Sequence, residues 1–417
     1  MPFDLRRLLP SDYRADPSGR GGYWAYLGHL VFLWAIAASN AFLGLMILWA
    51  GRHRRELDWR WSRTAPLLAP LGLYSIFLVV SVAFSVDPLE SVEELREIFS
   101  LATLALGLLL VSGERDVRRI FDFLIPVVAL LAVHGIWQYY FTDYGTLQNR
   151  IRGPFSHYQT FAGVLLVGDF LLLARIVSSN GYRKAWHWLA LVILNWTLLL
   201  TLTRGSWVAA GITLTAYVVM RARRHLVYVA GAVSGVLLCF VLLVPEAWER
   251  VRSIADLSDE SNYDRLCMID AGLYMVAERP LFGLGPRMVE RRYPIYRHPT
   301  APRLTVPHLH NTFLGLAAER GLTTLAAYLW LMAAGLWMAY RAYRREGGPR
   351  GARADLYVGV ILALVGFNLA GFFEDNWQDT EVQRLILFLL AVPLCLSPRT
   401  AEPGAAEGEV RGEEPPR

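Results

Sequence analysis

The chain has 417 residues, of which 54% are hydrophobic and only 18% charged, with a formal net charge of +5. Soluble globular proteins carry roughly 25% charged residues, so this composition excludes an ordinary water-soluble domain and indicates a membrane protein. The basic residues are arginine except for Lys184, and arginine offers phosphate a planar fork that lysine lacks. The three cysteines show neither paired spacing nor a metal-ligand pattern, which argues against disulfides and thiolate metal sites.

Residues 1–21 are polar and basic and resemble no cleavable signal peptide, so we expect a cytoplasmic N-terminus. The apolar stretch 22–50 follows. As one helix it would measure about 43 Å, which exceeds a hydrocarbon core of ~30 Å. The polar Ala38-Ser39-Asn40 in its middle predicts a break, and therefore a hairpin of two helices with both ends inside. One tilted helix is the alternative.

Ten further apolar segments are expected to cross the membrane, and short arginine-rich loops on one face connect alternate pairs of them. These segments are 65–84, 98–112, 117–141, 157–177, 185–203, 205–220, 225–244, 322–340, 354–373 and 382–397. The predicted fold is an all-α integral membrane protein of about twelve transmembrane helices, nine in 22–244 and three in 322–397. The tail 398–417, rich in Pro, Gly and Glu, is expected to be a disordered cytoplasmic segment.

The remaining segment, 245–321, is the only long polar stretch between apolar spans and is expected to face the periplasm. Nine arginines and nine acidic residues lie between 246 and 303, which predicts a folded, salt-bridged cap and argues against a polybasic lipid-binding tail. The apolar spacing of Leu266–Ala277 predicts a helix along the membrane surface. The glycines of 279–286 predict a tight turn, since no nucleotide-loop pattern surrounds them.

Two arginines are candidates for binding an anion. Arg204 lies between two abutting spans, at or just below the outer membrane surface, where arginine runs against the positive-inside bias. The alternative is an arginine that reaches up to lipid headgroups. Arg265 opens the amphipathic segment of the cap. Its alternative role is a salt bridge to a neighbour such as Asp264 or Glu278.

Two histidines, His308 and His310, close the cap. A neutral imidazole can act as a general base. A metal site is not expected, because carboxylates at a suitable spacing are lacking. Asn311 or Thr312 would suit the N-cap of the next helix. The acidic turn that contains Glu374 and Asp375 is either solvated or supplies an orienting carboxylate for the histidine.

These residues resemble the O-antigen ligase and polymerase superfamily over about residues 30–395. The resemblance is carried by four motifs. They are His310-Asn311 followed by nine residues and Gly321, Thr203-Arg204-Gly205-Ser206-Trp207, Gly153-Pro154-Phe155, and Arg279-Pro280-Leu281-Phe282-Gly283-Leu284-Gly285.

The resemblance implies a GT-C-type, inverting glycosyltransferase of the Gram-negative inner membrane that needs no metal or other cofactor. Its donor would be a glycan on undecaprenyl diphosphate and its acceptor a sugar hydroxyl of lipid A–core, with membrane lipids as surroundings and no nucleic acid. Arg204 and Arg265 would bind the diphosphate and His310 would act at the acceptor hydroxyl. His308, Asn311, Glu374 and Asp375 are expected to support the site. His308 departs from the motif and leaves open which histidine is the base.

The nearest alternative is the O-antigen polymerase of the same superfamily, which joins two lipid-linked repeats. A transferase that glycosylates proteins ranks behind it. A lipid-linked glycan transporter or flippase would place charges at mid-membrane and often repeat its halves. Here Asp169 and Asn195 are the main polar residues at span centres, and no internal repeat is found.

Overall fold

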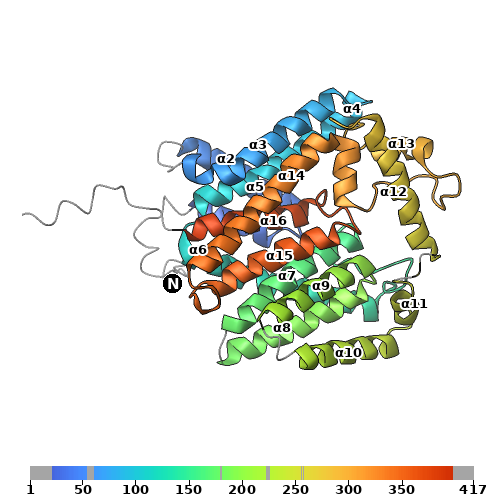
Figure 1. The fold of residues 1–417 in the computed structure, drawn as a ribbon. Coiled ribbons are helices and arrows are strands. Elements are labelled where there is room, and N and C mark those ends of the chain that lie inside the picture. Colours follow the sequence, from blue (N-terminus) through green and yellow to red (C-terminus); the bar gives the residue numbers. More distant parts are fainter. Residues whose placement is uncertain are drawn as a thin grey trace, which may run out of the picture.

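The computed structural model describes residues 21–53, 61–178, 181–221, 226–254, 256 and 258–397. The polar N-terminus up to residue 20 and the predicted cytoplasmic tail lie outside this range. The described residues form helices and loops without a β-strand. Figure 1 shows a bundle of long helices, with α11, α12 and α13 gathered at one end of it.

The first apolar stretch forms two helices, α1 (Gly21–Val31) and α2 (Ile36–Arg52), so the prediction of two helices over the single tilted helix is confirmed. The break lies at residues 32–35, slightly before the predicted Ala38-Ser39-Asn40. The polar side chains have another use: Arg384 donates to Ser39 Oγ at 2.9 Å and to Asn40 Oδ1 at 2.5 Å. A buried guanidinium thus finds neutral acceptors on α2.

Each of the other predicted spans overlaps one helix of the bundle. These helices are α3 (Trp61–Ala83), α5 (Glu97–Leu110), α6 (Gly113–Phe141), α7 (Tyr158–Ser178), α8 (Gly181–Leu200), α9 (Arg204–Arg221), α10 (Leu226–Leu243), α14 (Thr312–Arg345), α15 (Ala354–Ala370) and α16 (Thr380–Leu396). A short 3₁₀ turn, η5 (Gly348–Arg350), joins α14 to α15. Within the described residues, four helices are long and apolar enough to cross a membrane: Arg63–Ala83, Gly113–Phe141, Tyr158–Ile176 and Thr312–Arg345. The count of twelve spans remains a prediction.

The core of the bundle lies around α7 and α16. Every residue of α16 from Val382 to Leu396 is buried, which explains why its sequence is apolar almost all round. In contrast, α6 and α10 expose large apolar side chains such as Leu130, Leu238 and Leu242. Apolar faces of this extent fit a lipid environment better than water.

The predicted cap folds as three helices, α11 (Ala247–Arg252), α12 (Glu260–Glu278) and α13 (Met288–Tyr296). Helices α12 and α13 share a small hydrophobic core, separate from that of the bundle, which includes Met268, Met275 and Tyr293. The helix expected at Leu266–Ala277 is therefore confirmed as part of α12. The other side of α12 exposes Leu273 and Tyr274.

Ion pairs hold the cap as predicted, but several of them reach outside it. The short helices α4 (Pro88–Ser91) and η3 (Val92–Arg96) supply the acidic partners. Arg287 contacts Glu93 at 2.5 Å, and Arg291 contacts Glu90 at 2.5 Å. The balanced charge of the cap thus serves to attach it to the bundle as well as to fold it.

Helix α14 begins at Thr312, although the apolar pattern predicts a membrane helix from residue 322. The side chain of Asn311 accepts a hydrogen bond from Leu314 N at 2.9 Å and caps the helix. The helix is then broken at Gly321, whose φ of 81° and ψ of 167° are not helical. The expected boundary at 321–322 therefore corresponds to this break.

The break is where the glycine-rich turn of the cap attaches. Leu284 N donates to Ala318 O at 2.9 Å, Gly285 N to Glu319 O at 2.8 Å, and Leu322 N to Pro280 O at 2.8 Å. A Cβ on Gly283 would lie 2.4 Å from the carbonyl of Glu319. The two backbones can approach this closely only with glycine there. The tight turn predicted for 279–286 is confirmed. Its role is to attach the cap to α14 at the break.

Candidate functional site

Two histidines and one carboxylate meet in front of α14. His310 Nδ1 lies 2.9 Å from Glu374 Oε2, and His308 Nε2 lies 3.5 Å from Glu374 Oε1. The carboxylate accepts, which assigns the proton of a neutral His310 to Nδ1 and leaves Nε2 as a basic nitrogen. His310 also has a positive φ of 50°, a conformation that side-chain-bearing residues adopt rarely and often at functional sites.

Electrostatics keep this carboxylate ionised. Burial alone would raise the pKa of Glu374, but its hydrogen bond with His310 and its electrostatic interactions with His310, His308 and Arg265 lower it to about 2. Burial lowers the pKa of His308 to about 4, although Glu374 opposes this effect. Near neutral pH the pair therefore holds an ionised Glu374 beside a neutral His308.

The sequence argument against a metal site rested on the lack of a suitably spaced carboxylate, and that argument was wrong. Glu374 lies 64 residues beyond His310 in the chain, yet the ligand atoms of His308, His310 and Glu374 all lie within 4.8 Å of one another. This spacing is close enough for a cation. Arg265, which attracts Glu374, makes the surroundings positive and disfavours a divalent ion.

A pocket beside His310 brings together the three residues that sequence reasoning placed in the active site, Arg204, Arg265 and His310. Its walls come from α7, α9, α12, the loop before α7 and the cap. The lining residues are Arg150, Tyr158, Gln159, Leu202, Thr203, Arg204, Arg250, Ser261, Asp264, Arg265, Met268, Arg303 and His310. Five of them are arginines, so the pocket is suited to an anion.

Arg204 is the first residue of α9 and is buried, with 7% of its surface exposed. Its two terminal nitrogens both donate to Asp259 Oδ1, at 3.1 Å each, and one of them also donates to Ser253 O at 2.9 Å. The reading in which Arg204 reaches for lipid headgroups does not fit this burial. Gly205 beside it leaves space for Phe373, since a Cβ there would lie 2.4 Å from the Phe373 Cβ.

Arg265 forms no ion pair with Asp264 or Glu278, so its alternative reading as a salt bridge to these neighbours is wrong. Asp264 pairs with Arg303 at 3.2 Å, and Glu278 accepts a hydrogen bond from Tyr296. Burial lowers the pKa of Arg265, with Arg204 and Arg150 contributing, while Glu374 raises it. A partly buried guanidinium without a carboxylate in contact is an expected feature of an anion site.

The sequence analysis missed Arg150 and Arg250. Among the described residues neither has a carboxylate in contact, and Arg150 lies with its guanidinium 4.5 Å from the centre of the Tyr158 ring. Burial lowers the pKa of Arg250 to about 10, with Arg150 and Arg204 as further causes. Arg150 could have been found by the argument used for Arg204, because it too is an arginine on the face opposite the basic loops.

The acidic turn before α16 is buried, so the reading as a solvated turn was wrong. Glu374 points to the histidines, whereas Asp375 Oδ2 accepts from Gln378 Nε2 at 2.9 Å. Asn311 caps α14 and donates through Nδ2 to Phe372 O at 3.3 Å. Asn311 and Asp375 therefore hold the turn that carries Glu374, without contacting the pocket.

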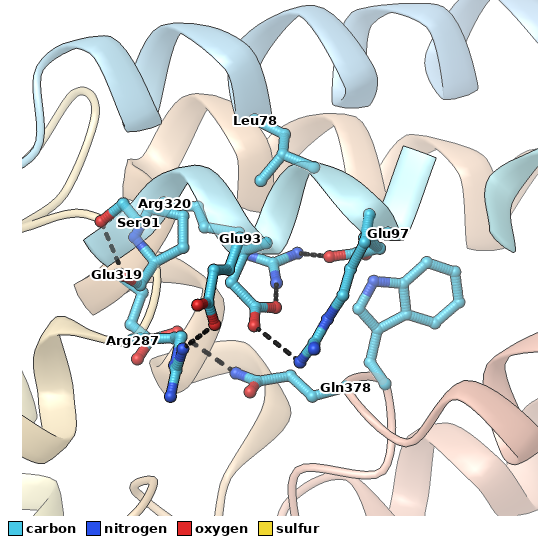
Figure 2. Close-up of polar contacts among 12 residues, drawn as sticks. Leu78, Ser91, Glu93, Glu97, Arg287, Glu319, Arg320 and Gln378 are labelled. Carbon is cyan, nitrogen blue, oxygen red and sulfur yellow. Dashed lines mark hydrogen bonds and ion pairs between the residues drawn. The ribbon is translucent and has the colours of Figure 1, made fainter. Parts of the chain in front are cut away.

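Figure 2 shows a second cluster of polar contacts, in which Arg320 faces Glu97 and Gln378 of the acidic turn faces Glu319. Arg320 contacts Glu97 at 2.5 Å and also donates to Tyr74, whose hydroxyl accepts from Trp377 Nε1. Gln378 Nε2 donates to both Glu319 and Asp375. We name this set the Arg320 cluster. It connects the turn that carries Glu374 to α3, α5 and the break in α14.

Comparison with known proteins agrees with the motifs. A family model described as O-antigen ligase matches residues 189–329, about a third of the chain. The matched region contains Arg204, Arg265 and His310, but neither Arg150 nor Glu374. No curated protein matches the chain. The resemblance to the O-antigen ligase and polymerase superfamily is thereby confirmed, and the match does not separate ligases from polymerases.

Proposed function

We propose that this chain, whose residues 189–329 match the O-antigen ligase family, transfers a glycan from undecaprenyl diphosphate to a sugar hydroxyl of lipid A–core. The reaction would be inverting, would need no metal, and would take place at the periplasmic face of the inner membrane. The observation that carries the proposal is the basic pocket next to an oriented histidine. The pocket suits a diphosphate and the histidine suits a hydroxyl.

The charge of the site supports a diphosphate donor. The pocket has five arginines, against which stand Asp264 in its wall, Asp259 on Arg204 and Glu374 on the histidines. Leaving the histidines out of the count, five positive and three negative charges leave an excess of two. A diphosphate diester carries one negative charge on each phosphate, so the donor would neutralise the pocket.

The chemistry needs one proton transfer and one displacement. His310 Nε2 would accept the proton of the acceptor hydroxyl while that oxygen attacks the anomeric carbon. The bond from this carbon to the diphosphate oxygen breaks, and its electron pair leaves with the diphosphate. Attack from the face opposite the leaving group inverts the anomeric centre.

Two groups of residues would stabilise this transition state. Glu374, held 2.9 Å from His310 Nδ1, favours the imidazolium that forms. Arg265, Arg150, Arg250 and Arg204 would neutralise the charge that develops on the leaving diphosphate, which is the role a divalent cation has in many nucleotide-sugar enzymes. Removing one such donor typically lowers kcat about 10²- to 10³-fold.

The test is glycan transfer with purified protein, undecaprenyl-diphosphate glycan and rough lipopolysaccharide, with a chelator present. We expect glycan on lipid A–core, and its loss in His310→Ala and Glu374→Gln. Full transfer by His310→Ala would contradict the base assignment. Longer lipid-linked chains without transfer to the core would identify the polymerase alternative. Dependence on an added divalent cation would assign His308, His310 and Glu374 to a metal instead.

A further inference from the structure

The arginines of the pocket differ in whether they already have a counter-ion. Arg150, Arg250 and Arg265 have no carboxylate in contact among the described residues. Arg204, beside them, is paired with Asp259 at 3.1 Å. If Arg204 binds the donor, this pair is in competition with it.

The geometry makes the competition direct. Both terminal nitrogens of Arg204 donate to the same oxygen of Asp259, so the forked edge that would bind a phosphate is occupied. The side chain of Asp259 is 26% exposed, against 7% for Arg204. The carboxylate is thus the more accessible partner of the two, and an incoming anion can exchange with it.

Asp259 also has a second, structural role. It is the N-cap of α12 and accepts from Asn262 N at 3.3 Å, and α12 is the helix that carries Arg265. An asparagine or serine can serve this capping role equally well. The capping role and the charge of Asp259 can therefore be separated by substitution.

We propose that Asp259 is a resident counter-ion of Arg204 that the diphosphate of the donor replaces, so that Asp259 sets the affinity for the donor. This proposal rests on the proposed function. Three neighbouring guanidiniums already repel one another, and a fourth without a counter-ion would be destabilised further. Asp259 neutralises Arg204 and holds it in place until the donor supplies two negative charges. Because the donor must displace Asp259, its affinity is lower than it would be if Arg204 had no counter-ion.

The test measures binding of inorganic pyrophosphate by calorimetry in detergent, without divalent cations, alongside glycan transfer. We expect Asp259→Asn to bind pyrophosphate about three- to tenfold more tightly than the wild type, the effect of releasing one partly exposed ion pair. The KM for the donor should fall by a similar factor. Asp259→Ser, which keeps a capping side chain, should behave in the same way.

A double-mutant cycle separates this exchange from a general change of charge. In the Arg204→Ala background, Asp259→Asn should no longer change the affinity for pyrophosphate. Asp264→Asn is the matched control, because it removes the same charge from the same pocket but faces Arg303. Its effect should persist when Arg204 is replaced.

The outcomes distinguish the inference from the proposed function. A wild-type protein that neither binds pyrophosphate nor transfers glycan would refute the proposed function. If the wild type does both, while Asp259→Asn binds pyrophosphate equally or more weakly, the counter-ion proposal is refuted. An equal gain from Asp259→Asn with and without Arg204 would also refute it, because the effect would then be one of overall charge.

Discussion

Arg265 and Arg320 are both arginines set close to the junction of cap and bundle, yet their surroundings differ. Arg320 is 1% exposed and contacts Glu97 and Tyr74, with Glu94 at 4.0 Å. Arg265 has no carboxylate in contact among the described residues, and burial lowers its pKa. Arg320 therefore has its counter-ions within the protein, whereas the arginines of the basic pocket require an anion to neutralise them.

The presence or absence of a carboxylate partner distinguishes structural arginines from candidate ligand-binding arginines more clearly than their burial does. A paired buried arginine fixes the orientation of its neighbours. An arginine without a carboxylate partner can instead form its charge-assisted hydrogen bonds with a ligand, which contributes to the free energy of binding. The same distinction applies within the pocket, where Arg204 has a counter-ion and Arg150 does not. Substitutions of the two kinds of arginine should therefore have opposite signatures.

The largest effect on stability is expected from the Arg320 cluster. Arg320→Met leaves Glu97 buried without its partner, and breaking such a pair typically lowers the free energy of unfolding by about 3–5 kcal/mol. Thermal unfolding in detergent measures this loss. The double substitution Arg320→Met with Glu97→Met removes both charges and should restore most of it. A single variant as stable as the wild type would contradict the comparison.

The basic pocket should give the opposite result. Arg265→Ala is expected to lower kcat for glycan transfer about 10²- to 10³-fold, because one donor to the leaving diphosphate is lost. Its midpoint of thermal unfolding should not fall, since no carboxylate loses a hydrogen-bonded partner. Arg291→Ala is the control: that side chain is about half exposed and pairs with Glu90 of α4, outside the pocket. Transfer by this control should remain within twofold.

A smaller effect is expected where the cap attaches to the break in α14. Gly283→Ala would place a Cβ 2.4 Å from the Glu319 carbonyl at a φ of 68°, which we expect to destabilise the cap by about 1–3 kcal/mol. Gly211→Ala in α9 is the matched control, because nothing lies within 4 Å of its Cβ. Alanine there should stabilise the helix slightly. Hydrogen exchange across α12 and α13 distinguishes the two variants.

A further effect concerns pH. The folded pKa of His308 lies near 4, below its ordinary value near 6.5. The unfolded chain therefore binds a proton at a higher pH than the native protein does. Stability from this residue is complete above about pH 6.5 and declines as the pH falls toward 4. His308→Gln should flatten the unfolding midpoint in this window, and an unchanged slope would contradict the assignment.

Much of the bundle could be predicted from apolar runs, because each of the ten later runs overlaps one helix and, apart from the start of α14, the ends are displaced by only a few residues. The break between α1 and α2 was expected as well, although Ser39 and Asn40 bond to Arg384 and do not form it. The apolar pattern placed the start of α14 at residue 322, because residues 312–321 lack a continuous apolar run, whereas the N-cap expected at Asn311 or Thr312 is confirmed at Asn311. A single cap residue, Asn311, decides that boundary.

The candidate site could be predicted in part. Arg204, Arg265 and His310 stand in recognisable local patterns, and the structure brings all three to one pocket. Glu374 and Arg150 come from loops far away in the chain. No local sequence pattern indicates that Glu374 contacts His310 or that Arg150 lines the same pocket. Sequence reasoning could name Glu374 as an orienting carboxylate, but only the fold shows its 2.9 Å contact and the opposite orientation of Asp375.

The contact between Gly283 and the break at Gly321 has a consequence for recognising relatives of this protein. A Cβ on Gly321 would lie 2.1 Å from Leu281 O, so main chain meets main chain on both sides and no second substitution can make room. The two glycines should then be inherited together wherever the cap is attached in this way. The two glycines indicate the fold, whereas His310 and the pocket arginines indicate the activity. A related protein that has lost the activity should keep Gly283 and Gly321 but accumulate substitutions at His310 and the arginines.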